Sequence, residues 1–184
     1  MTDINSAALA KRRSGAPDAA AAAPSAAESR LIGYVELLFF AYRDFTGEAD
    51  QVLEELGFGR AHHRVLHFVN RTPGLRVIDL LDILKITKQS LARVLRALIE
   101  QGYIEQRLGE VDRRERLLYA TERGRALAAR LAGLQIARVK KALAETGHGG
   151  DAAVEKFLTA MIAPEDQPRV AAMIEADRRG PRTP

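Results

Sequence analysis

Apolar residues recur every three to four positions in "SRLIGYVELLFFAYRDF", which begins at Ser29 and predicts a helix. The apolar positions cover two adjacent faces, so the helix is apolar around most of its girth. Such a helix is buried on more than one side, which in a domain of this size indicates a subunit interface as well as a core. One face holds Leu31, Val35, Leu38, Tyr42 and Phe45, and the other holds Tyr34, Leu37, Phe40 and Ala41.

Three shorter helices are predicted after Gly59. The first, "GRAHHRVLHFVNRTPG", stops at the turn signal Thr72-Pro73-Gly74, and the second is "VIDLLDILKI". The third, "TKQSLARVLRALIEQG", has Thr87 as its N-cap and Gly102 at its end. Two short helices across a tight turn form a candidate helix-turn-helix. The outer side of the last helix carries Lys88, Gln89, Ser90, Arg93 and Arg96.

The apolar period then changes from 3.6 to 2 in "YIEQRL". Residues 116–120 can return as a partner strand, which makes a β-hairpin directly after the helix-turn-helix. This is the layout of a winged helix, so the fold class is mainly α with a small β-hairpin wing. The arginines crowded near the hairpin tip repel one another, which indicates an anionic partner such as DNA. These arginines are Arg113, Arg114 and Arg116.

The remaining chain is predicted to be helical. A long helix, "TERGRALAARLAGLQIARVKKALAETG", is broken at residues 147–150 and followed by two shorter apolar helices. The long helix has too little chain around it to cover its apolar side, which favours a partner subunit and a homodimer. The expected organisation is a disordered tail (1–27), a dimerisation helix (28–56), a winged helix-turn-helix lobe (57–122) and C-terminal dimerisation helices (123–180).

The charge balance is mildly basic. The 184-residue chain has 28 Lys and Arg against 24 Asp and Glu, a formal net charge of +4. Any role with nucleic acid therefore depends on where the charge lies. The absence of cysteine excludes disulfides, thiolate metal sites and cysteine nucleophiles. No apolar run approaches the roughly 20 residues that span a membrane, so no membrane partner is expected.

The N-terminal 27 residues are rich in alanine, serine and proline and offer no periodic apolar face, so they are predicted to be disordered. The "KRR" at 11–13 is interpreted as part of a solvated tail, with contact to DNA phosphates as the alternative. The segment lacks the compact apolar core of a secretory signal, and a cytoplasmic location is expected.

Residues from about 57 to 125 resemble the DNA-binding lobe of the MarR family of bacterial transcription regulators. The resembling segments are "HHRVLHFVNRTPGLRVIDLLDILKITKQSLARVLRALIEQGYIEQ" and the wing "DRRERLLYATERG". The family wing has an Asp-x-Arg, then an apolar strand ending in Leu-Thr, then a glycine. This chain matches with Asp112, Arg114, Thr121 and Gly124, and Ala120 replaces the usual leucine.

The segment "LKITKQSLARVL" is similar to the family's entry into the recognition helix, with Thr87, Lys88, Ser90 and Arg93 in the matching positions. Two positions depart from the family pattern. Ala92 stands where a serine is common, and Lys85 where glycine often makes the turn. "LGFGRAHHRVL" is similar to the PetP-like branch of the family.

The resemblance implies a role for each DNA-facing residue. Arg114 would enter the minor groove, oriented by Asp112 through a charge-assisted hydrogen bond, while Arg113 and Arg116 would contact phosphates. Thr87, Lys88, Gln89, Ser90 and Arg93 would serve the recognition helix, where Gln89 suits adenine and Arg93 suits guanine. In the family the first and last helices pair between protomers.

The histidines are the one feature that suggests other chemistry. His62, His63 and His67 lie on one predicted helix, and the last two have the i, i+4 spacing that can hold a metal. Packing or interface histidines are the favoured interpretation, with a metal or haem site and contact with an organic effector as alternatives. Neither a Glu-x-x-His pattern, a phosphate loop nor a nucleophile elbow accompanies them, so an enzyme is not expected. No cofactor is expected either.

The sequence therefore predicts a dimeric, sequence-specific transcription regulator, expected to be a repressor that binds a palindromic operator in double-stranded DNA. The alternative is a weakly specific, nucleoid-type DNA-binding protein. In the family, small aromatic or anionic molecules often bind at the junction between the dimer and DNA regions. A small organic acid is accordingly expected to release DNA from a pocket formed by Tyr34, Phe39, Tyr42, His62, His63 and His67.

Overall fold

The computed structural model describes residues 24–110 and 112–178. Most of the tail predicted to be disordered, residues 1–23, therefore lies outside the described residues. Contacts divide the chain into two units, residues 1–42 and 43–184. Helix α1 (Ala26–Glu54) begins in the first unit and ends in the second.

Helix α1 begins three residues before the predicted start at Ser29. A capping box explains the difference: the Ser25 backbone N–H donates to Glu28 Oε2 at 2.8 Å, and the Glu28 N–H donates to Ser25 Oγ at 3.3 Å. Each residue thus satisfies a backbone donor that the first turn would leave unpaired. The signal was present in the sequence as "SAAE".

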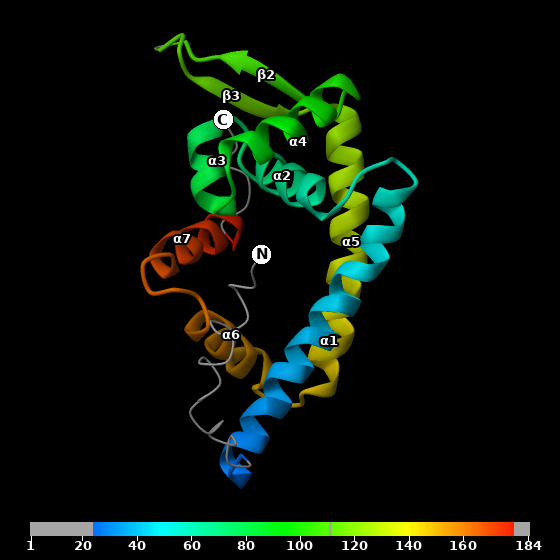
Figure 1. Cartoon of the computed structure of the whole chain (residues 1–184), viewed down its shortest axis with the longest axis vertical. Coiled ribbons are helices and arrows are strands. Elements are labelled where there is room, and N and C mark those ends of the chain that lie inside the picture. The colour runs from blue at the N-terminus through cyan, green and yellow to red at the C-terminus, as the bar shows by residue number, and fades with distance from the viewer. Residues whose placement is uncertain (1–23, 111, 179–184) are drawn as a thin grey trace, which may run out of the picture. The chain divides into compact units, whose positions relative to one another are not determined.

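The winged lobe contains the predicted elements in the predicted order (Figure 1). Helix α2 spans Arg60–Arg71, α3 spans Val77–Leu84 and α4 spans Lys88–Glu100. Strands β2 (Ile104–Leu108) and β3 (Arg116–Ala120) form the predicted antiparallel hairpin, with Leu108 opposite Arg116.

A third strand was not predicted. Strand β1 (Leu75–Arg76) pairs antiparallel with β3, so the sheet order is β1-β3-β2. Two residues are too few to show an alternating pattern, which is why sequence periodicity missed this strand. β1 joins the wing to the residue immediately before α3.

The core of the second unit lies where α2, α4 and the sheet meet the first half of α5 (Glu122–Glu145). Ile104, the first residue of β2, and Tyr103 just before it are both buried. Phe58 meets Tyr103 edge-on, with ring centroids 5.2 Å apart. Residues that are essentially inaccessible include Leu53, Val65, Leu66, Val69, Leu80, Leu91, Leu98, Leu118 and Leu131.

The chain continues into α6 (Gly150–Ala160) and α7 (Gln167–Arg178) after the predicted break. Helix α7 is tied to the helix-turn-helix: the Arg71 guanidinium donates to the Met173 carbonyl at 3.2 Å, and Arg169 pairs with Asp82 of α3. The last helix therefore lies against α2 and α3 of its own chain.

Helices α1 and α6 each present several large apolar side chains to solvent in the single chain, and α5 adds Ile136 and Val139. The part of α1 in the first unit exposes Leu31, Ile32, Tyr34, Val35, Leu37, Phe39, Phe40 and Tyr42. Helix α6 has no buried residue and exposes Val154, Phe157 and Leu158, and Met161, its C-cap, continues the same spacing of i, i+3, i+4 and i+7.

Candidate nucleic-acid interface

The entry into α4 is built by a left-handed residue and a side-chain cap. Lys85 ends α3 with φ 51° and ψ 44°, a conformation that favours glycine, so the lysine reproduces the turn expected of glycine. Thr87 Oγ1 accepts from the Ser90 backbone N–H at 3.2 Å and donates to Ser90 Oγ at 3.0 Å. Thr87 is the N-cap as predicted, and its hydroxyl is committed to holding the first turn.

The outer face of α4 is hollowed. A concavity of about 500 Å³ is lined by Gln89, Ser90, Ala92, Arg93 and Arg96. The first two and Arg93 belong to the predicted recognition set, and the structure brings them together on one side of the helix. Arg96 extends this face by one turn beyond Arg93.

The wing tip is closed by backbone and side-chain hydrogen bonds. The Arg114 backbone N–H donates to Asp112 Oδ1 at 2.8 Å, and the Glu115 N–H donates to the Asp112 carbonyl at 3.0 Å. The Gly109 N–H donates to the Glu115 carbonyl at 3.2 Å. Asp112 therefore holds the backbone at Arg114, and the guanidinium of Arg114 remains exposed to reach outward.

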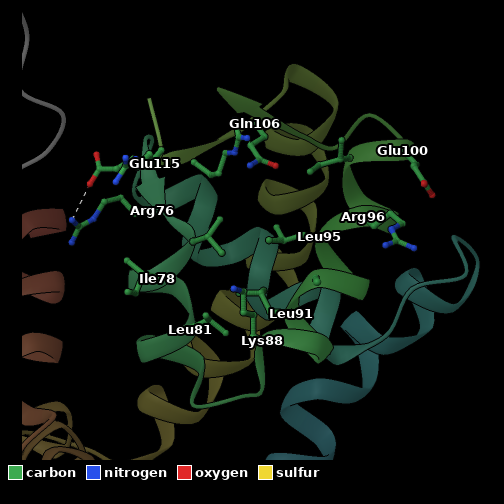
Figure 2. A pocket seen from close by; sticks show the side chains of 15 residues that line it. Arg76, Ile78, Leu81, Lys88, Leu91, Leu95, Arg96, Glu100, Gln106 and Glu115 are labelled. Atoms are coloured by element: carbon green, nitrogen blue, oxygen red, sulfur yellow. Dashed lines mark hydrogen bonds and ion pairs between the residues drawn. The ribbon is translucent and has the colours of Figure 1, made fainter. Parts of the chain in front are cut away.

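A larger hollow of about 850 Å³ separates α4 from the wing (Figure 2). Its floor is apolar and includes Leu81 of α3 and Leu91 and Leu95 of α4, which are labelled in Figure 2. Cationic residues stand on both sides of it: Lys88 and Arg96 come from α4, and Arg114 and Arg116 from the wing. We call this feature the helix–wing hollow. Arg113 does not line it.

Several cations of the winged lobe are already paired. Arg107 is ion-paired with Glu105 and stacks over the Tyr119 ring at 4.5 Å, while Arg123 donates to the Gln101 carbonyl at 2.9 Å. By contrast, in residues 24–110 and 112–178 the cations of the predicted interface have no side-chain hydrogen bond or ion pair. These cations are Lys88, Arg93, Arg113, Arg114 and Arg116, and among the described residues Arg96 beside them on α4 is likewise without a side-chain partner. The described cations of the lobe that lack any side-chain partner thus lie on the recognition helix and the wing, where an anionic duplex would be met.

The three histidines lie along α2, and their side chains make separate contacts. The His62 ring stacks on Phe58 with centroids 4.7 Å apart, and its Nδ1 accepts from the Gly59 N–H at 3.1 Å. His67 meets Phe68 edge-on. Burial lowers the pKa of His63 below its usual value, and burial together with the nearby charge of Arg93 lowers the pKa of His62. The lowered pKa values favour the neutral form of both rings near pH 7.

The described part of the chain contains no cluster of three or more His, Cys, Asp or Glu side chains placed to hold a metal ion. The aromatic residues expected to join the histidines in a pocket, Tyr34, Phe39 and Tyr42, lie in the first unit and are exposed. That shared pocket stays a prediction. Among the described helices, none is both long and apolar enough to cross a membrane.

Two features of this site were missing from the predicted set. Arg96, which the sequence placed on the outer side of this helix but to which it gave no role in DNA contact, shares the outer face of α4 with Arg93. Arg76 at the end of β1 bonds to Asp79 of α3 and to Glu115 of the wing. Its partner Glu115 is 39 positions away in the sequence, so no local pattern could have shown the contact.

Comparison with known proteins agrees with this arrangement. A model of the MarR family matches residues 56–115, which cover the helix-turn-helix and most of the wing. The HTH-type transcriptional regulator PetP of Rhodobacter capsulatus is 46% identical over 130 residues, which are 71% of this chain and 78% of that protein.

Solved structures show the same fold. The crystal structure of MarR is matched with a TM-score of 0.58 and 22% identity, over 77% of this chain and 93% of that one. Streptococcus pneumoniae FabT in complex with DNA is matched with a TM-score of 0.59 and 21% identity, over 73% of this chain and 94% of that one. The S. aureus MepR–DNA complex is matched with a TM-score of 0.58 and 19% identity, over 70% of this chain and 95% of that one.

Proposed function

This chain belongs to the MarR family of DNA-binding transcription regulators, and from that premise we propose that it is a homodimeric repressor that recognises a palindromic operator and acts in the cytoplasm. The observation that carries the proposal is the set of unpaired cations on the outer face of α4 and on the wing. Four of them, Lys88, Arg96, Arg114 and Arg116, line the helix–wing hollow from its two sides, so one duplex can meet both elements. Nothing in this arrangement calls for turnover, and the family consists of regulators rather than enzymes.

Each element of the interface suits a different part of DNA. Gln89 and Arg93 project from the first two turns of α4, where side chains can pair with adenine and guanine edges in the major groove. Arg114 stands at the wing tip, and arginine suits the narrow, electronegative minor groove because its guanidinium is planar and weakly hydrated. Arg113 and Arg116 would contact phosphates.

A dimer follows from the exposed apolar side chains of α1 and α6. Monomeric proteins rarely expose contiguous apolar surface of more than a few hundred Å², and larger patches mark interfaces. A two-fold pair would place two recognition helices about 34–36 Å apart, in successive major grooves, and so would require a palindromic site.

Footprinting across the DNA upstream of this protein's own coding region tests the proposal. We expect two protected half-sites about 10 base pairs apart, and a ratio of specific to random-DNA affinity of roughly 10³ or more at a stated salt concentration. A weakly specific, nucleoid-type protein would instead protect DNA without a boundary and bind both DNAs within a few-fold. That result would replace the operator model with this alternative. If transcription of the regulated gene increases when the protein occupies its operator, the protein is an activator and not a repressor.

We also propose that a small organic acid releases the DNA by binding at His63 and His67 on α2. The half-buried His62 and His63 are neutral, so they would act as N–H donors to a carboxylate. The charge of Arg93 on α4 lowers the pKa of His62, which links this end of α2 electrostatically to the recognition helix. A release of about 100-fold requires roughly 2.7 kcal/mol of differential affinity between the two states.

Changing His63 and His67 together to Phe should keep the fold and DNA binding and abolish the response to the acid. The measurement is operator affinity with and without benzoate-class acids. A double variant that responds like the wild type would show that these histidines serve packing alone.

A further inference from the structure

Arg76 stands at a position where an arginine is unexpected. It is the N-cap of α3, with extended backbone angles, and its side chain makes no capping hydrogen bond. Ser, Thr, Asp and Asn are preferred at N-caps because their short side chains accept from the first-turn N–H groups. Arginine has no acceptor, so α3 forgoes a side-chain cap, and the side chain is available for another task.

The Arg76 guanidinium joins two elements. Its Nε and Nη2 donate to the two carboxylate oxygens of Asp79 at 2.7 Å each, which is the bidentate arrangement. Its Nη1 donates to Glu115 Oε1 at 3.2 Å, the contact drawn as a dashed line in Figure 2. Asp79 fixes the direction of the guanidinium, and the remaining nitrogen holds the wing.

The Arg76–Glu115 contact lies just beyond the last backbone pair between β1 and β3. Arg76 is the last residue of β1 and is paired with Leu117 of β3, after which the chain turns into α3. No β1 residue is left to pair with the part of the wing beyond Leu117. The Arg76–Glu115 contact continues the connection by side chains to the residue whose backbone closes the tip turn with Gly109 and Asp112.

Arg76 and Glu115 both line the helix–wing hollow. Arg114 and Arg116 flank Glu115 on the wing, whereas Lys88 and Arg96 stand on α4. One rigid duplex must meet both sets, because the recognition helix occupies a major groove and the wing an adjoining minor groove. A wing free to swing about its base would lose orientational freedom on binding, at a cost in affinity.

We propose that Arg76 is a positioning residue that locks the wing to the helix-turn-helix through Glu115, and so presets the spacing between wing arginines and recognition helix for DNA. This inference rests on the proposed DNA-binding function. Arg76 itself is neutralised by two carboxylates and is not a DNA contact. Its effect is transmitted through Glu115 to Arg114 and Arg116.

The variant Glu115→Gln tests this proposal, because loss of the lock and loss of the charge change the affinity for DNA in opposite directions. Removing a carboxylate beside the wing arginines reduces repulsion of DNA phosphates, so charge alone predicts tighter binding. The lock predicts weaker binding to operator DNA, by up to about fivefold per wing, the upper limit for an exposed ion pair. Glu105→Gln is the matched control: it makes the same charge change on the wing and breaks the ion pair with Arg107, but leaves Arg76 untouched.

Amide hydrogen exchange of the free protein gives a second measurement that needs no DNA. The N–H groups of Gly109 and Glu115 should exchange faster in Glu115→Gln than in the wild type, and Glu105→Gln should leave them unchanged. Equal exchange in all three proteins would overturn the lock. This readout remains decisive even if the wild type shows no preference for any operator, an outcome that would reject the proposed function separately.

A double-mutant cycle with Arg76→Met completes the test. If the two residues act as a unit, the double variant should bind operator about as weakly as Arg76→Met alone. Fully additive losses, or tighter operator binding by Glu115→Gln, would overturn the proposal.

Discussion

Arg113 and Arg114 are neighbours in the sequence and both exposed, yet only Arg114 lines the helix–wing hollow. The Asp112 carboxylate binds the backbone N–H of Arg114, which fixes the direction in which its side chain leaves the turn. Two neighbouring arginines therefore differ in position, and the hydrogen bond to Asp112 is made by only one of them. We expect their contributions to DNA binding to differ accordingly.

Arg114→Ala should weaken specific binding by roughly 1–3 kcal/mol per contacted site, felt twice in a dimer, and should reduce any preference for A·T pairs beneath the wing. Arg113→Ala should lower affinity for all sequences alike and flatten the salt dependence by about one unit of slope. Titrations at several salt concentrations, on operator and random DNA, distinguish the two. Unchanged affinity and salt slope in both variants would remove the wing from the interface.

His63 predicts a pH dependence of folding. Burial lowers its pKa in the folded state, so below the ordinary value near 6.5 the unfolded chain binds a proton that the folded protein does not. Stability should therefore be fully present above about pH 6.5 and fall as the pH drops from there towards the lowered pKa. Denaturant titrations of the wild type and His63→Phe should show a shallower acid slope in the variant. An equal slope would mean that other groups govern the loss.

The elements of the winged lobe are held together by close backbone approaches as well as by side-chain packing. Gly124 lies in the first turn of α5, and Thr121, its N-cap, accepts from the Gly124 N–H at 3.0 Å. A Cβ on Gly124 would lie 2.0 Å from the Tyr103 carbonyl oxygen, at the base of β2. The glycine thus allows α5 to begin directly against the chain entering the wing.

Gly124→Ala should destabilise the protein by more than about 2 kcal/mol, because backbone must move to admit the methyl group. Gly133→Ala is the matched control in the same helix. No neighbour lies within 4 Å of its Cβ position, so the change should stabilise α5 by up to about 1 kcal/mol. Chemical denaturation measures both, and a neutral Gly124→Ala would show that α5 and Tyr103 can separate at little cost.

The exposed apolar helices have consequences for the whole molecule. Large apolar side chains of α1 and α6 are solvent-accessible in the single chain, which predicts an obligate two-fold dimer burying well over about 2,000 Å². DNA binding to a palindrome should depend on that assembly, because each protomer reads one half-site.

Phe157→Asp, or Leu38→Asp, should therefore give monomers or aggregates that lose operator binding, since a buried unpaired carboxylate is strongly unfavourable. Thr159→Asp makes the same charge change on α6 away from its apolar positions, and should leave assembly intact. Sedimentation and operator titrations measure the outcome. A stable wild-type monomer that binds a palindrome tightly would contradict the dimer.

The order of the helices, the two strands of the hairpin and the Thr87 cap were predicted from the sequence, because each depends on residues within about one helical turn or one hairpin. The apolar period located α2 to α5, and its change to 2 located β2 and β3. Thr87 and Thr121 act as N-caps through partners only three residues away.

Only the tertiary structure decided how these elements constrain one another. The two-residue β1 forms because β3 offers it a partner about 40 positions later, and Arg76 meets Glu115 for the same reason. The burial that leaves His63 neutral comes from packing that no local pattern encodes. The residues available for DNA contact were therefore a property of the sequence. Which cations remain unpaired, and how far the wing stands from the recognition helix, depends on contacts between segments that are distant along the chain.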